Sequence, residues 1–194
     1  SYSLVTGPAF IIFTIGNFIG SQKAAAVIAI AHYVGALING FFYRNHEEKK
    51  EKRKGGGKPP KGDYLENFTD AIVSGFKAMA MILAYLMVFT IGINILEHLG
   101  VFSVINNQGV AASFKGIFEM TIGINLVGMC DMGIRLKSVI AAFLVSFGGL
   151  SVAGQSMSMA RGSGIGLADI LKIKLTHGMI AAIITTILIH IVVI

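Results

Sequence analysis

Glycine, proline and small polar residues interrupt two apolar stretches of the sequence, and interruptions of this kind can bind small anions. Where a helix restarts after such a break, its first N–H groups lack partners and carry partial positive charge. A carboxylate can accept these hydrogen bonds, and nearby hydroxyl and amide groups can add donors. The alternative is a purely structural role, in which small residues let helices pack closely and serine bonds to its own helix. The candidate substrate-binding residues are Thr6, Gly7 and Pro8 in the first break, and Gly148, Gly149, Ser151, Gln155 and Ser156 in the second.

A third group of candidates lies in the short apolar segment 116–128. This segment is too short to cross a bilayer and too apolar for a surface loop, which predicts a re-entrant hairpin. Glu119 is a carboxylate inside it, and a buried ionisable group is a functional candidate by default. It either carries a coupling proton or accepts N–H bonds from a neighbouring broken helix and braces the hairpin. The further candidates in this segment are Thr121, Gly123 and Asn125.

Each break is followed, at similar spacing, by a histidine on an apolar span: His32 after Pro8, and His177 after Gly149. This similarity suggests an inverted repeat of the kind from which transporters are built, with chance as the alternative. If the repeat is real, Pro8 and Gly149 approach each other near the bilayer midplane. A histidine on a span is more often an interhelical hydrogen-bonding group than a proton carrier, and both roles stay open here.

The sequence carries no recognisable enzyme or metal motif. Cys130 is the single cysteine, which excludes an internal disulfide framework and a cysteine-based zinc site. We find no nucleophile elbow, no His-Glu-x-x-His and no phosphate loop. An intramembrane hydrolase that uses Ser151 and His177 is the enzyme alternative. We therefore expect no enzyme activity, no bound metal and no cofactor other than a coupling H⁺ or Na⁺.

Long uncharged runs place the chain in a membrane. Charged residues make up 13% of the sequence and hydrophobic residues 54%. Each run approaches the roughly 20 residues that an α-helix needs to cross the hydrocarbon. The expected fold is an all-α polytopic membrane protein with broken helices and re-entrant hairpins. The runs are Ser1–Gln22, Ala24–Tyr43, Ala78–Leu96, Leu99–Phe114, Ser138–Ala160 and Leu175–Ile194.

A basic linker divides the chain into two parts. Arg44 to Lys61 contains eight of the 16 Lys and Arg residues, which places it on the cytoplasmic side by the positive-inside rule. A nucleic-acid-binding arm is the competing interpretation, but no aromatic residue interleaves the charges, and we expect no nucleic-acid partner. The expected parts are a broken helix and a span over 1–43, the linker 44–62, and a second repeat 63–194. The second repeat would contain a helix 64–98, a hairpin 116–129, a broken helix 134–160 and a last span 168–194.

Four motifs in order give the chain a family resemblance. Together they resemble the YlbJ-type sporulation integral membrane family, whose members carry the nucleoside-recognition Gate domain. The likeness covers nearly the whole chain apart from the basic linker. The motifs are Gly7-Pro8-Ala9-Phe10-Ile11-Ile12, Ala29-Ile30-Ala31-His32-Tyr33-Val34-Gly35, Gly116-Ile117-Phe118-Glu119-Met120-Thr121-Ile122-Gly123 and Ser146-Phe147-Gly148-Gly149-Leu150-Ser151-Val152-Ala153-Gly154-Gln155-Ser156.

The resemblance implies a multi-pass permease with two inverted repeats and paired re-entrant hairpins, distantly similar to concentrative nucleoside transporters. Sporulation members of the family move dipicolinic acid towards the forespore across the outer forespore membrane, and this implies a small organic anion as substrate. An ion-coupled nucleoside or metabolite transporter and a non-transporting membrane scaffold are the alternatives. The chain lacks the family's first spans and the hairpin that pairs with Gly116 to Gly128. We therefore expect that the other half of the site either lies on another chain or has been removed.

Overall fold

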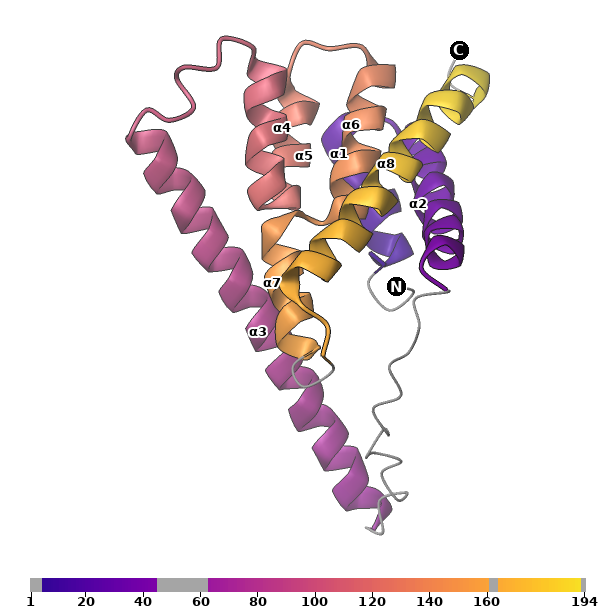
Figure 1. Ribbon diagram of the computed structural model, residues 1–194, viewed down its shortest axis with the longest axis vertical. Helices are drawn as coiled ribbons and strands as arrows, with labels where there is room; N and C mark the ends of the chain where they lie inside the picture. The colour runs from indigo at the N-terminus through magenta and orange to yellow at the C-terminus, as the bar shows by residue number, and fades with distance from the viewer. Residues whose placement is uncertain (1–4, 45–62, 161–163, 193–194) are drawn as a thin grey trace.

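The computed structural model describes residues 5–44, 63–160 and 164–192, and all of its regular elements are helices (Figure 1). In the described residues, a short π-helix runs directly into one α-helical turn, and seven further helices follow. Their bounds are η2 Phe10–Ile15, α1 Gly16–Ile19, α2 Gln22–Phe42, α3 Tyr64–His98, α4 Gln108–Phe118, α5 Met120–Met129, α6 Ile134–Phe147, α7 Gly149–Met159 and α8 Leu167–Val192.

Four helical segments are long and apolar enough to cross a membrane: α2, α3, the broken pair α6–α7 and α8. The prediction of an all-helical membrane protein is therefore confirmed. Two of the six uncharged runs do not form a helix of spanning length. The described part of Ser1–Gln22 contains the short helical segment Phe10–Ile19, and Leu99–Phe114 begins with non-helical residues. An uncharged run reports hydropathy alone, and it does not reveal where a helix stops.

The hairpin predicted over 116–129 begins earlier, at Gln108. Asn107 is the N-cap of α4, and its side-chain oxygen accepts a hydrogen bond from the Val110 N–H at 3.1 Å. Helix α4 ends at Phe118, the chain turns at Glu119, and α5 runs back beside α4 (Figure 1). A Cβ on Gly123 would lie 2.1 Å from the Gly116 Cα, so the two helices touch backbone to backbone. The hairpin is therefore two packed helices, with Glu119 at its tip.

The core lies where α2, α6 and α8 pack against one another and against the N-terminal helical segment. Apolar side chains from each of these elements are fully buried, including Ile11, Ile28, Leu144 and Ile189. Gly20 ends α1 with a φ of 75°, a left-handed conformation that glycine adopts without steric cost, and the chain turns there into α2. This packing holds α2 beside α8, which places the two sequence-predicted histidines on facing helices.

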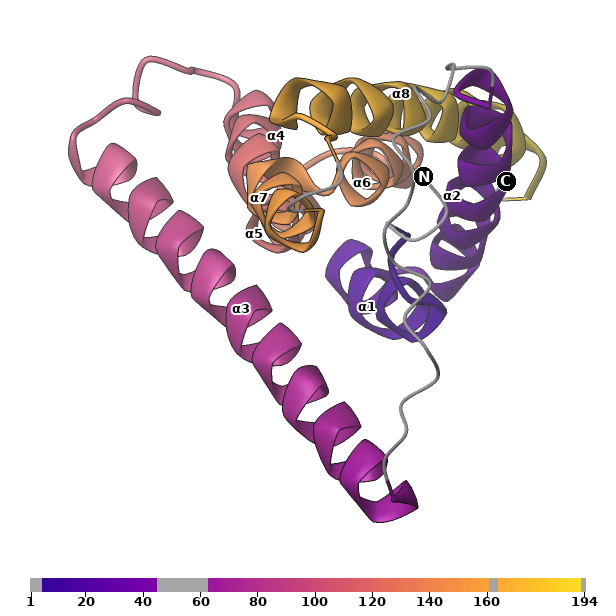
Figure 2. The same ribbon diagram turned by 60° about the horizontal axis from the view of Figure 1, so that its bottom comes forward.

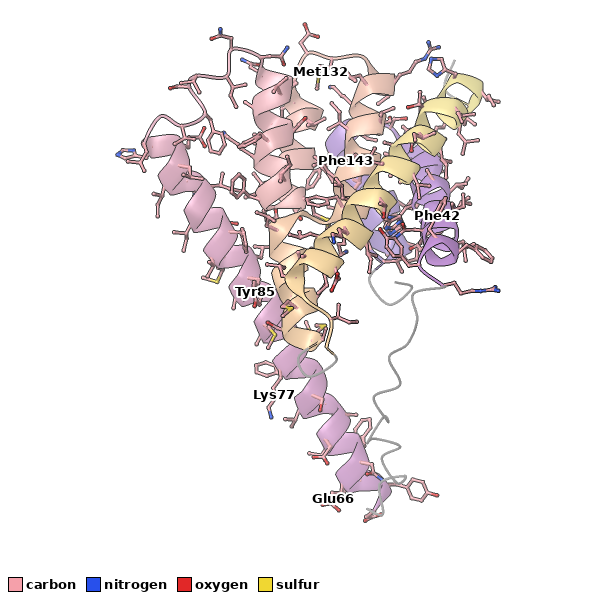
Figure 3. The ribbon with its side chains drawn as sticks, viewed as in Figure 1. Phe42, Glu66, Lys77, Tyr85, Met132 and Phe143 are labelled. Carbon is pink, nitrogen blue, oxygen red and sulfur yellow. The ribbon has the colours of Figure 1, made fainter. Side chains whose placement is uncertain are left out.

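Helix α3 stands apart from the rest of the molecule (Figure 2). Of its 35 residues, Ile93 alone is fully buried among those described. The Tyr85 hydroxyl and the Ser158 hydroxyl of α7 lie 2.6 Å apart, and Lys115 of α4 forms a 2.7 Å ion pair with Glu97. Figure 3 labels Glu66 and Lys77 on the part of α3 that extends beyond these contacts. The uncovered residues are mostly apolar, as expected for a helix in contact with lipid.

The basic linker falls almost entirely on residues 45–62, which lie outside the described residues. Its cytoplasmic location stays a prediction.

Candidate functional site

The candidate site is a junction where the tip of the α4–α5 hairpin meets the break between α6 and α7. Gly148 and Gly149 have φ values of 81° and 72°, which L-residues with a side chain rarely adopt. A Cβ on Gly149 would lie 3.1 Å from the Phe118 carbonyl oxygen and 3.2 Å from the Met120 nitrogen. Glycine is thus required here both for the turn and for the close approach of the hairpin. The start of α7 and the start of α5 are neighbours in the interior.

The two helices that begin at this junction differ in how their first turns are satisfied. Glu119 is 3% exposed, and its carboxylate accepts a hydrogen bond from the Ile122 N–H at 2.8 Å. It therefore caps α5, the second helix of its own hairpin, instead of a neighbouring broken helix. The N-cap of α7 is Gly148, which has no side chain, and no side-chain cap is found for this helix. The first N–H groups of α7 are consequently available to another acceptor.

His32 connects the two breaks. Its Nε2 accepts a hydrogen bond from the Thr6 backbone N–H at 3.0 Å, and its Nδ1 lies 2.8 Å from the Ser146 hydroxyl oxygen. Since a backbone N–H can only donate, we assign the hydrogen to Nδ1, which then donates to Ser146. Tyr33 adds a bond from its hydroxyl to the Thr6 carbonyl at 2.7 Å. The segment before η2 and the end of α6 are therefore both held by α2.

His177 lies against His32, with ring centroids 4.9 Å apart. Its Nε2 is 2.9 Å from the His32 carbonyl oxygen, and since a carbonyl accepts, this nitrogen donates. A Cβ on Gly35 would lie 3.4 Å from the His177 ring, so α2 and α8 approach closely at this level. The two histidines of the suggested repeat thus meet. The inverted relation between the two parts stays a prediction.

Lys174 is a residue of this region that the sequence did not reveal. It is 3% exposed, and a Cβ on Gly148 would lie 3.3 Å from its Nζ. Lys174 lies inside the predicted last span 168–194, directly before the uncharged run that begins at Leu175, and it is not among the candidate residues of the sequence analysis. Its spacing from His177 was the available signal, because residues three apart on a helix share a face.

The structure places the other predicted residues at different distances from the junction. Ser151 lies in the first turn of α7 and is 1% exposed. Ser156 is farther along the same helix, and its hydroxyl donates to the Val152 carbonyl at 2.7 Å. This is the bond to its own helix that a purely structural role predicts. Gly7 and Pro8 are exposed at the start of the chain. Thr121, Asn125 and Gln155 are half-buried on α5 and α7.

The junction is closed in this conformation. A cavity of about 230 Å³ lies between α4 and α5 and is lined by residues including Gln108, Lys115 and Cys130. Another, of about 310 Å³, lies along the end of α3 around Asn94 and His98. Neither is lined by Gly148, Gly149 or Lys174. Within the described ranges, no group of three or more His, Cys, Asp or Glu side chains is arranged to hold a metal ion.

Comparison with known proteins relates the chain to a sporulation membrane protein. It is similar to the sporulation integral membrane protein YlbJ of Bacillus subtilis (strain 168), with 23% identity over 216 residues. The match covers 94% of this chain and 53% of YlbJ, so the chain spans about half the length of this curated relative. No protein-family model matches the chain, and no solved structure matches it. The match supports a relation at the family level.

Proposed function

We propose that this chain belongs to a membrane transporter for a small organic anion, and that the anion is dipicolinate. The observation that carries the proposal is the start of α7, a helix that begins inside the molecule with a glycine at its N-cap and no side-chain cap. Helix ends of this kind, within broken spans, are where transporters bind substrates and coupling ions. An anion supplies the acceptor that α7 lacks.

The depth of the break fits this role. Helix α6 contains 14 residues and α7 contains 11, so the break lies about 21 Å and about 16 Å from the two ends of the α6–α7 segment. If this segment crosses the bilayer, Gly148 lies near the midplane. Backbone that leaves a helix at such a depth has to be buried in protein or line a cavity.

Transport requires the junction to open, because the hairpin backbone now lies against Gly149. The first turn of α7 becomes exposed when α7 moves away from the tip of the hairpin. The similarity to a sporulation membrane protein is what favours dipicolinate, which carries two carboxylates on one ring, over other organic anions.

Uptake of labelled dipicolinate and labelled uridine into liposomes that contain the purified protein tests the proposal. We expect saturable dipicolinate uptake and no uridine uptake above protein-free liposomes. Imposed H⁺ and Na⁺ gradients would identify a coupling ion. Uptake of uridine alone would indicate the nucleoside transporter, and uptake of neither would indicate a scaffold.

A pair of glycine variants separates the junction from general effects on the protein. Gly149→Ala places a Cβ against the hairpin backbone and on a left-handed residue, and we expect dipicolinate uptake to be lost. Gly75→Ala is the matched control, since a Cβ there meets nothing within 4 Å. Equal uptake by the two variants would contradict a role for the junction.

A further inference from the structure

The hydrogen bonds of His32 and His177 determine where each ring carries a hydrogen. The Nε2 of His32 accepts from the Thr6 backbone N–H at 3.0 Å, so the hydrogen of this ring is on Nδ1, which lies 2.8 Å from the Ser146 hydroxyl oxygen. His177 differs, because its Nε2 carries the hydrogen and donates to the His32 carbonyl at 2.9 Å. Both ring nitrogens of His32 are therefore engaged while the ring is neutral.

A second proton on His32 conflicts with its bond to Thr6. The proton can bind only at Nε2, because Nδ1 already carries the hydrogen. A protonated Nε2 is a donor, and the Thr6 N–H that faces it is also a donor. Two donors cannot form a hydrogen bond with each other, and a backbone N–H cannot rotate away as a hydroxyl can. Protonation of His32 and its contact with Thr6 are therefore mutually exclusive.

The groups that face His32 in this conformation do not favour a positive charge on its ring. The side chain is fully buried. Its own helix α2 contributes the ring of Tyr33, at a centroid distance of 5.2 Å, and the contacts from α6 and from the N-terminal segment are with uncharged groups. Helix α8 contributes His177 and, one turn before it, Lys174, and a positive charge on either repels one on His32. None of these neighbours is a carboxylate, so the closed conformation keeps His32 neutral.

The segment that His32 holds is connected to the α4–α5 hairpin. It continues from Thr6 into η2 and α1, and α1 packs against α5. The contact is close, since a Cβ on Gly128 would have no room beside the Phe18 carbonyl oxygen. Helix α5 begins at the hairpin tip that closes the junction. A movement of the segment at Thr6 therefore reaches the hairpin through α1.

We infer that His32 is the binding site of a coupling proton, and that a proton on its Nε2 releases the N-terminal segment from α2. The assignment of H⁺ as the coupling ion rests on the proposed transport function, whereas the proton site itself does not. Because the proton binds the released form and not the closed form, acid shifts the population towards release.

The pH range of this shift follows from the released form, in which the ring meets water. An imidazole in water titrates near pH 6.5, so the closed form is fully favoured well above this pH and loses its advantage as the pH falls through it. One proton changes the ratio of released to closed protein by at most about 10-fold per pH unit. We therefore expect the release between about pH 7 and pH 5.

Nitrogen-15 NMR of the full chain in detergent micelles, labelled at histidine and threonine, tests the proton site without a substrate. The chain has five histidines, and the spectrum of His32→Gln identifies the His32 signals. Thr6→Ser identifies the Thr6 amide signal, because serine keeps the backbone N–H but is absent from a threonine-labelled spectrum. Near pH 8 we expect a neutral His32 with its hydrogen on Nδ1. On acidification we expect the imidazolium to form over the same pH range in which the Thr6 amide signal shifts.

Three results of this measurement would overturn the inference: a His32 hydrogen on Nε2 near pH 8, a ring that is still neutral at pH 5, or protonation that leaves the Thr6 amide signal unchanged. If His32→Gln does not fold, replacement of the other histidines one at a time assigns the His32 signals by elimination. The wild-type titration then decides the question by itself.

Uptake of dipicolinate into liposomes gives the functional readout. An imposed proton gradient should drive uptake by the wild type, and His32→Gln, which cannot titrate, should lose the pH dependence. His177→Gln is the matched control, since it removes the neighbouring histidine and leaves the bond between His32 and Thr6, and it should keep the pH dependence. A pH dependence that survives in His32→Gln and disappears in Glu119→Gln would overturn the inference. If the NMR signals behave as expected but dipicolinate is not transported, the proposed function fails and the proton site stands.

Discussion

Replacing Gly123 with alanine tests whether the hairpin depends on direct backbone contact between its two helices. The new Cβ would lie 2.1 Å from the Gly116 Cα and 2.6 Å from its nitrogen. Carbon atoms in contact prefer a separation of about 3.5–4.0 Å, so α5 would have to move by more than about 1 Å. Overpacking of a core costs about 1–3 kcal/mol. Because backbone atoms cannot rotate aside, we expect a loss of about 3 kcal/mol in the free energy of unfolding.

The assay is equilibrium unfolding in mixed micelles with increasing SDS, followed by circular dichroism. Gly92→Ala is the matched control, since Gly92 is helical in α3 and a Cβ there meets nothing within 4 Å. Alanine stabilises a helix interior by about 0.5–1 kcal/mol relative to glycine, so this variant should unfold at a higher SDS concentration than the wild type. If Gly123→Ala unfolds together with Gly92→Ala, the close contact between α4 and α5 does not exist and the reasoning is refuted.

Three further predictions use other residues. Glu119→Ala should lower the free energy of unfolding by about 1–2 kcal/mol and Glu119→Gln by less, because an amide oxygen still accepts from Ile122; wild-type stability of the alanine variant would contradict the cap. If Glu119 carries a coupling proton, Glu119→Gln should also abolish the pH dependence of uptake. Thr185→Val should stabilise the protein by about 1 kcal/mol in the same titration, because the Thr185 hydroxyl is buried without a partner; destabilisation would reveal a missed hydrogen bond. A cysteine at Gly56 in a Cys130→Ser background should react with an impermeant thiol reagent from the cytoplasmic side, and labelling from outside intact cells would place the linker on the other side.

The break in the α6–α7 segment and the extent of α3 were predictable because local chemistry determines them. Gly148 and Gly149 interrupt an apolar run, and both adopt the left-handed conformation that glycine favours. The apolar spacing that follows Tyr64 predicts a helix to His98, and α3 has these bounds. In both cases the signal lies within a few residues of the feature, and no distant contact is needed to produce it.

The start of the hairpin and the position of Lys174 were not predicted, for two different reasons. Asn107 signals a helix start through its own side chain, but it lies inside the uncharged run Leu99–Phe114, and hydropathy alone marks no helix boundary within that run. Lys174 is buried by contacts with helices that are distant in the sequence, and hydropathy assigns any lysine to water. A capping search would have found the first, whereas the second depends on how α8 crosses the end of α6.

The two attachments of α3 make this helix a restraint on the opening of the junction. Tyr85 ties α3 to α7, and Glu97 ties it to α4, at points about 18 Å apart along the helix axis. In the transport cycle that we propose, these are the two helices that separate when α7 leaves the hairpin. Any such separation must lengthen one of the two bonds or tilt α3 in the membrane. A spin label on the exposed part of α3 would therefore register the opening of a site that it does not touch.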